Sequence, residues 1–177
     1  MLEVEIKIRV DIEDTINKLV AIGFARGTTV YEYDTYYNGL VDLKAADKAL
    51  RIREHRDVDT GVTKYVLNYK GPKIDDVTMT REETQFMVPT FRHGEIVLNG
   101  LGYEAAGYVE KTRIHYKKDD ITCCLDSVTD LGDFLEVEIM ADEMDYEAAV
   151  SKIEDLLKAL GLSMEDTIRN SYLSMLE

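Results

Sequence analysis

The sequence has few of the residues that mark secreted, zinc-binding or multidomain proteins. Its only cysteines are Cys123 and Cys124. Neighbours on a strand point to opposite faces, so we expect neither a disulfide between them nor a two-cysteine zinc site. Two prolines and eleven glycines among 177 residues leave little material for a flexible linker. No shift in composition marks a boundary, and the length favours one domain over 1–177.

Long apolar runs are missing too. No stretch approaches the roughly 18–20 apolar residues that a membrane span requires. The N-terminus alternates charged and apolar residues from the start, without the basic leader and apolar run of a signal peptide. We therefore expect a cytoplasmic protein with no membrane partner.

Positive charge is scarce. Lys and Arg number 21 against 35 Asp and Glu, which gives a formal net charge of −14. Nucleic acids and anionic membranes bind to basic patches, so a surface this acidic argues against both. A small anionic ligand remains compatible with this charge if the basic residues are segregated from the surface.

The sequence does contain a period-two alternation of charged and apolar residues over its first 140 positions. In Glu3–Val10 every odd position is charged and every even position is apolar. Similar segments follow at Thr28–Tyr37, Leu50–Arg56, Thr63–Lys70, Met79–Val88, Tyr108–Lys117, Ile121–Asp126 and Asp133–Met140. Turn residues such as Asp59-Thr60-Gly61 separate them. The pattern predicts eight strands in a mostly antiparallel meander.

Helical spacing of apolar residues appears between and after these strands. Asp11 is suited to cap a helix that Gly23 ends, and the segment His93–Leu101 is compatible with a short helix. The last 35 residues predict a helix over Asp145–Leu160 and another from the cap Ser163 to Leu176. The predicted fold class is α+β, an eight-stranded antiparallel β-barrel with helices packed outside.

The charged strand faces are unusual because they are rich in arginine, which suits bidentate phosphate recognition. A solvated face is the ordinary interpretation of one amphipathic strand. Here the pattern recurs, at Lys7 and Arg9, Arg51 and Arg53, Lys70, Arg81, and Lys111 and Arg113. Together with the acidic residues on the same strand faces, these residues carry a small net positive charge. The net negative charge of the chain therefore comes from its other residues. One consistent arrangement is an inverted barrel with charges inside and apolar faces outward under the helices.

The motifs resemble the CYTH superfamily, which groups class IV adenylyl cyclases, thiamine triphosphatases and inorganic triphosphatases. Glu3-Val4-Glu5-Ile6-Lys7 is similar to its Glu-x-Glu-x-Lys signature, which is weak alone. The other matches follow in the family's order over nearly the whole chain: Asp34-Thr35-Tyr36-Tyr37, Leu50-Arg51-Ile52-Arg53, Lys70-Gly71-Pro72, Arg81-Glu82-Glu83, Lys111-Thr112-Arg113, Leu125-Asp126 and Leu131–Glu138. The resemblance implies a triphosphate tunnel inside the barrel.

The resemblance also implies roles for individual residues. The triphosphate clamp would be Lys7, Arg51, Arg53, Lys70, Arg81, Lys111 and Arg113. The ligands of Mg²⁺ or Mn²⁺, which prefer hard oxygen donors, would be Glu3, Glu5, Glu136, Glu138 and Asp126. Lys70 and Tyr36 would be catalytic, Tyr36 as a proton carrier near Lys70.

Several positions have a second interpretation. Tyr36 fits a core aromatic, and Asp126 fits a strand end. Glu83 could serve only in an ion pair with a neighbouring arginine. Arg9 could be a solvated residue at the end of its strand, and His115 could lie at the surface near a hairpin.

Three functions are compatible with these residues. A class IV adenylyl cyclase, which makes cyclic AMP and pyrophosphate from ATP, is favoured because the strand Leu131–Glu138 and the segment Asn170-Ser171-Tyr172-Leu173 resemble that branch. The second is a triphosphatase acting on thiamine triphosphate or inorganic tripolyphosphate. The third is a non-catalytic binder of triphosphate or polyphosphate, which clustered carboxylates beside the clamp argue against. A homodimer is a reasonable expectation for this family.

Overall fold

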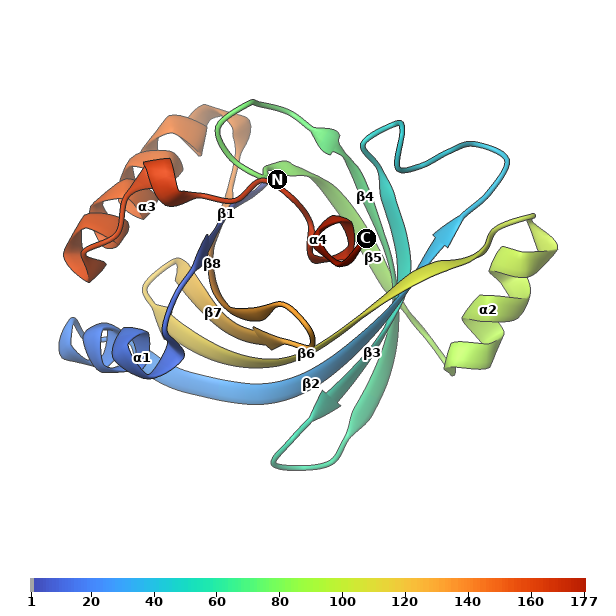
Figure 1. Cartoon of the computed structure of the whole chain (residues 1–177), viewed down its shortest axis with the longest axis horizontal. Coiled ribbons are helices and arrows are strands. Elements are labelled where there is room, and N and C mark those ends of the chain that lie inside the picture. The colour runs from blue at the N-terminus through green and yellow to red at the C-terminus, as the bar shows by residue number, and fades with distance from the viewer. Residues whose placement is uncertain (1) are drawn as a thin grey trace.

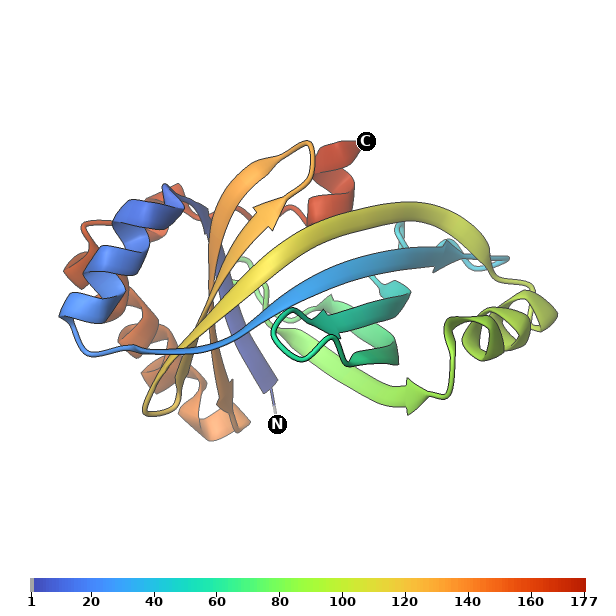
Figure 2. The same cartoon turned by 90° about the horizontal axis from the view of Figure 1, so that it is seen from below.

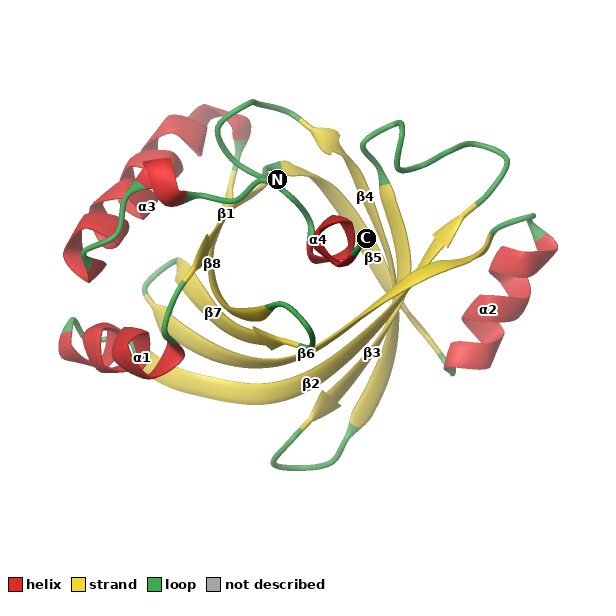
Figure 3. Cartoon of the chain, in the orientation of Figure 1, coloured by secondary structure: helices red, strands yellow, loops and turns green. Residues whose placement is uncertain are grey.

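The chain forms one closed antiparallel β-barrel of eight strands, in a computed structural model that describes residues 2–177 (Figures 1 and 3). The strands are β1 Leu2–Arg9, β2 Ala25–Asn38, β3 Ala49–Asp57, β4 Thr63–Lys73, β5 Arg81–Val88, β6 Glu104–Lys118, β7 Ile121–Val128 and β8 Gly132–Ala141. Each predicted strand is present, with ends shifted by a few residues. The predicted fold class is confirmed.

The order of the strands around the barrel differs from a simple meander. It is β1-β5-β4-β3-β2-β6-β7-β8, closed by the pairing of β8 with β1. The long strands β2 and β6 pair from Ala25 opposite Lys117 to Asn38 opposite Glu104, and this pairing joins two separate meanders. A helix follows β1 directly, so β2 does not turn back beside it, and β1 instead closes the ring between β5 and β8.

Three helices pack on the outside of the barrel (Figure 1). α1 (Ile12–Ala21) and α3 (Tyr146–Leu160) cover the outward apolar residues of β1, β7 and β8, where Leu19, Ile153 and Leu157 pack against Ile6, Ile8 and Leu125 in the largest core cluster. α2 (Phe91–Gly100) covers β3, with Leu98 packed in a cluster with Ile52. Among residues 2–177, no helix is long and apolar enough to cross a membrane.

The helix ends follow the sequence signals. The side chain of Asp11 accepts a hydrogen bond from the Asp14 amide at 2.8 Å, which caps α1. Gly161 ends α3 in the left-handed conformation, at φ 74°. Such a φ is strained for residues that carry a Cβ, so glycine is suited to this position.

The C-terminal segment does not form the single helix predicted from Ser163 to Leu176. A 3₁₀ turn over Met164–Asp166 is followed by extended chain, in which the Ile168 amide donates to the Lys7 carbonyl at 2.7 Å. This pairing with β1 competes with helix formation, and helix α4 (Tyr172–Leu176) begins only after the new cap Ser171. α4 is ringed by the strands in Figure 1 and lies at one end of the barrel in Figure 2, beside the C-terminus. Unlike α1, α2 and α3, it does not pack outside the barrel.

α4 sits close against the inner wall of β6. A Cβ placed on Gly107 would lie 2.5 Å from Leu173 Cδ1, so the helix approaches β6 where the strand has no side chain. Tyr172 packs in the same place against Phe134, with ring centroids 5.1 Å apart. The barrel is therefore filled at this end and leaves its free space elsewhere.

An inverted barrel has no apolar core inside, so its core lies between the outer faces of the strands and the helices that cover them. The variant Leu157→Ala tests this arrangement. Leu157 is fully buried, so the variant should lose about 2–5 kcal/mol of unfolding free energy, measured by urea denaturation. Leu40→Ala is the matched control, since Leu40 is fully exposed, and it should change stability by less than about 0.5 kcal/mol. Equal effects would contradict the assignment of the core to the outer surface of the barrel.

Candidate active site

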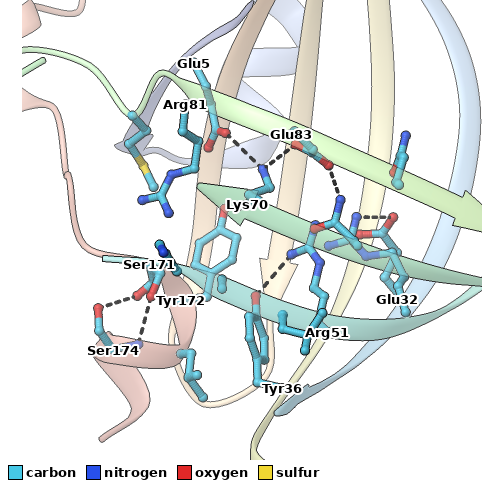
Figure 4. Close-up of a pocket in the computed structure, with 18 of the residues that line it drawn as sticks. Glu5, Glu32, Tyr36, Arg51, Lys70, Arg81, Glu83, Ser171, Tyr172 and Ser174 are labelled. Atoms are coloured by element: carbon cyan, nitrogen blue, oxygen red, sulfur yellow. Dashed lines mark hydrogen bonds and ion pairs between the residues drawn. The ribbon is translucent and has the colours of Figure 1, made fainter. Parts of the chain in front are cut away.

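A cavity of about 730 Å³ occupies the inside of the barrel (Figure 4). Its walls come from all the strands except β7 and from the C-terminal segment. The volume lies in the range of sites for cofactors and nucleotide-sized molecules. The period-two alternation explains its character: inward positions carry charge, and outward positions carry the apolar residues under the helices. The inverted barrel predicted from the sequence is confirmed.

One group of buried charges joins β2 and β3. Arg53 donates to both oxygens of Asp34, at 2.7 and 2.8 Å, and to Glu32 Oε1 at 3.0 Å. Arg51 donates to Asp34 Oδ2 at 3.2 Å. Burial alone would raise the pKa of Asp34, but the two guanidinium groups hold it below its ordinary value. The pairs fix both arginines at the wall of the cavity.

A second group joins β6, β7 and β8. Arg113 donates to the two oxygens of Asp126 at 2.6 Å each, and it also pairs with Glu136. Lys111 donates to Asp126 at 2.9 Å. Arg113, Lys111 and Lys7 together hold the pKa of Glu136 well below its ordinary value, against the opposing effect of its burial. These contacts place the predicted clamp cations Lys7, Lys111 and Arg113 on one inner wall.

The structure gives Asp126 a role other than the metal ligand expected from the sequence. Its side chain is fully buried and does not line the cavity. Both oxygens accept from Arg113, and Oδ2 also accepts from Lys111 and from the Tyr172 hydroxyl at 2.9 Å. Asp126 is therefore positioned to orient the clamp, and we leave it out of the candidate metal ligands.

The remaining carboxylates gather around Lys70. Its ammonium lies 3.2 Å from Glu3 Oε2, 3.7 Å from Glu5 Oε2 and 2.9 Å from Glu83 Oε2, and Figure 4 shows it between Glu5 and Glu83. Glu138 stands directly opposite Glu5 in the pairing of β1 with β8. Three of the predicted ligands, Glu3, Glu5 and Glu138, therefore share one wall of the cavity. The predicted ligand Glu136 is instead ion-paired with Lys7 and Arg113.

Burial, with added repulsion between like charges, raises the pKa values of two carboxylates on this wall. Burial, with added repulsion from Glu5 and Glu138, raises the pKa of Glu3 from 4.5 to about 8. Burial and the neighbours Glu5 and Glu136 raise the pKa of Glu138 to about 7. Burial opposes charge on Lys70 as well, but the surrounding carboxylates raise its pKa above the ordinary value. Lys70 is thus held protonated, as a fixed positive charge and not as a base.

The donor set fits a hard divalent cation, but the ligands are not preassembled. Carboxylate oxygens are the donors that Mg²⁺ and Mn²⁺ prefer, and mutual repulsion would be relieved by a cation between them. Within residues 2–177, however, no three His, Cys, Asp or Glu side chains converge in a geometry ready to hold a metal ion. The Lys70 ammonium lies among them instead.

Tyr36 belongs to the cavity more than to the core. Its ring is half-buried and packs against the cluster around α4, while its hydroxyl accepts from Arg51 at 3.1 Å. The expected contact with Lys70 is not among the hydrogen bonds of the described residues. The hydroxyl lines the cavity and is oriented by a clamp arginine.

Other predicted residues divide between the cavity and its surroundings. Arg81 lines the cavity and donates to the Gly71 carbonyl at 3.1 Å. Glu83 does form an ion pair, with Lys70 instead of the expected arginine. His115 lines the cavity, contrary to the surface interpretation, whereas Arg9 is exposed and donates to the Leu131 carbonyl at 2.7 Å.

Three important residues received no role from the sequence. Glu32 and Asp34 lie two residues apart on the inner face of β2, so the alternation could have identified them as partners of the arginines. Tyr172 had no such signal. Its ring lies 4.1 Å from the Lys7 ammonium and 5.1 Å from that of Lys111, contacts that depend on the docking of α4.

Comparison with known proteins agrees with this geometry. The profile of the CYTH domain matches residues 1–172. A protein of Methanocaldococcus jannaschii named "putative adenylate cyclase" is 34% identical over 178 residues, which cover 99% of this chain and 98% of that protein.

Solved structures show the same fold. The PH1819 protein of Pyrococcus horikoshii superposes with a TM-score of 0.89 at 32% identity, covering 98% of this chain and 97% of that one. A Hippeastrum protein, described as a "putative adenylyl cyclase" with a dominant triphosphatase activity, has a TM-score of 0.65 at 17% identity, covering 91% and 88%, and supports the fold alone. On the domain match and the 34% identity over its length, the chain belongs to the CYTH family.

Proposed function

We propose that the protein is a divalent-metal-dependent adenylyl cyclase that binds ATP inside the barrel and releases cyclic AMP and pyrophosphate. The observation that carries the proposal is the cavity wall itself, where buried, ion-paired cations adjoin a cluster of carboxylates. Members of the CYTH family are adenylyl cyclase-like or triphosphatase enzymes, and the M. jannaschii relative carries a cyclase name.

The size and lining of the cavity support a nucleotide over a bare inorganic triphosphate. The lining of the cavity also includes the apolar residues Leu43, Leu50 and Leu173. A phosphate chain gains nothing from apolar surface, whereas a nucleobase is stabilised by it. Hydrolysis of a triphosphate is the alternative outcome, to be distinguished by the products.

The charged side chains that line the cavity would carry out the reaction. Arg51, Arg53, Lys111 and Arg113 would bind phosphate oxygens and orient the chain, with Asp34 and Asp126 holding the guanidinium groups rigid. The ribose 3′-hydroxyl oxygen would attack the α-phosphorus and lose its proton to water. The bond from the α-phosphorus to the oxygen that bridges to the β-phosphate would break, and the same cations would stabilise charge on the departing pyrophosphate. Mg²⁺ or Mn²⁺, held by Glu3, Glu5 and Glu138, would neutralise phosphate charge.

Product analysis tests this proposal directly. The protein is incubated with ATP, thiamine triphosphate and tripolyphosphate, each with Mg²⁺, Mn²⁺ or EDTA. We expect cyclic AMP and pyrophosphate from ATP, and none in EDTA. Glu5→Gln should reduce turnover more than about 100-fold because it removes a metal ligand, while the exposed control Glu13→Gln should not. Release of orthophosphate would replace the cyclase with a triphosphatase, and turnover in EDTA would contradict the metal assignment.

Arg51 tests the clamp because its Nε is buried without a hydrogen-bond partner. Arg51→Lys keeps a positive charge beside Asp34 but loses the donor fork, so tripolyphosphate should bind at least about tenfold more weakly by calorimetry. The control is Arg56→Lys on the same strand, since Arg56 stacks on Tyr31, 4.7 Å from the ring centroid, and is not part of the cavity wall. Equal affinities of the two variants would remove Arg51 from the clamp.

The raised pKa values of Glu3 and Glu138 predict how stability depends on pH in the metal-free protein. Between the ordinary value of 4.5 and about 8, the folded state binds more protons than the unfolded state. The free energy of unfolding should therefore fall as pH rises through this window. Glu3→Gln lacks one of these protons, so from about pH 5 to about pH 8 the wild type should lose at least about 1 kcal/mol more than the variant. Parallel curves in EDTA would show that the carboxylates do not form one cluster.

A further inference from the structure

Lys70 stands apart from the other inward cations in the kind of partners it has. Arg51 and Arg53 pair with Asp34, and Arg113 pairs with Asp126, Glu136 and Glu138. Lys70 contacts Glu3, Glu5 and Glu83, two of which are candidate metal ligands. Its Nζ is within 4 Å of all three carboxylates, on a side chain that is only 18% exposed.

We propose that the Lys70 ammonium is an internal counter-ion that occupies the place of the divalent metal and competes with it. The ammonium contacts Glu3 Oε2 and Glu5 Oε2, which belong to two of the carboxylates that would hold the metal ion. A lysine ammonium carries one charge, so it neutralises the wall only in part. A divalent cation would neutralise it better but must first displace the ammonium.

The strand pairing gives the ammonium another partner when it is displaced. Lys70 and Glu83 are direct neighbours across β4 and β5, and their contact at 2.9 Å is the shortest of the three. Glu83 also accepts from the side-chain amide of Asn68, which ties it to β4. An ammonium released by Glu3 and Glu5 can therefore remain beside Glu83 at the cavity wall, where phosphate oxygens would meet it.

The inference uses the proposed function only for the identity of the metal ligands, and Mn²⁺ binding without any triphosphate tests it. The free Mn²⁺ in equilibrium with protein is measured by electron paramagnetic resonance. Lys70→Met should bind Mn²⁺ at least about tenfold more tightly than the wild type, because the competing charge is gone. Lys70→Arg keeps that charge and should bind about as weakly as the wild type.

The matched control is Lys73→Met on the same strand. Lys73 pairs with Asp47 and makes no ion pair with the carboxylates of β1, so its loss should leave Mn²⁺ affinity unchanged. A second measurement distinguishes weaker folding from altered metal binding. Mn²⁺ should raise the melting temperature of Lys70→Met by more than it raises that of the wild type.

Two results would overturn the inference. One is Mn²⁺ affinity in Lys70→Met equal to or weaker than that of the wild type. The other is a destabilised Lys70→Met that Mn²⁺ does not restore, which is the behaviour of a purely structural lysine. If Mn²⁺ binds as expected but no triphosphate is turned over, the counter-ion role stands and the proposed function fails.

Discussion

Bidentate pairing of arginine with aspartate inside the barrel is the interaction on which the rest of the structure depends. Arg53 with Asp34 and Arg113 with Asp126 each bring two charges out of water, and each pair is completed by two hydrogen bonds. Removal of one partner from such a pair costs about 3–5 kcal/mol, because the other is left buried and unpaired. The pairing lets a ring of cations face one cavity. It also obliges the apolar strand faces to lie outward, under α1, α2 and α3.

The inward carboxylates divide into two kinds by their electrostatic surroundings. Asp34 and Glu136 sit against arginines, which lower their pKa values. Glu3 and Glu138 sit among other carboxylates, and their pKa values are raised to about 8 and about 7. Arginine offsets the burial of the first kind. For the second kind burial outweighs the nearby positive charge, although Glu3 contacts Lys70 and Glu138 contacts Arg113. This difference separates the clamp from the candidate metal site without reference to sequence motifs.

The sequence predicts the barrel well because the alternation is strict and the charges on it are unusual. The alternation of charged and apolar residues predicts the strands and which of their faces point inward. The paired arginines on those faces indicate that the barrel binds phosphate. The strand order is not predictable in the same way, since the pairing of β2 with β6 depends on closure of the whole ring. The same limit applies to Asp126. Its position suggests a metal ligand, and only packing shows that Arg113, Lys111 and Tyr172 take its oxygens. α4 begins late because β1 pairs with the chain before it, which is also a long-range contact.

The central claim is that a triphosphate binds inside the barrel, between the arginines of β3 and the basic residues of β6. A crystal structure of the protein with the non-hydrolysable analogue imidotriphosphate tests it most directly. The account predicts three phosphorus positions within the ring of strands, with oxygens in contact with Arg51, Arg53, Lys111 and Arg113. An analogue bound on the outer surface, with the ion pairs of the cavity unchanged, would contradict it.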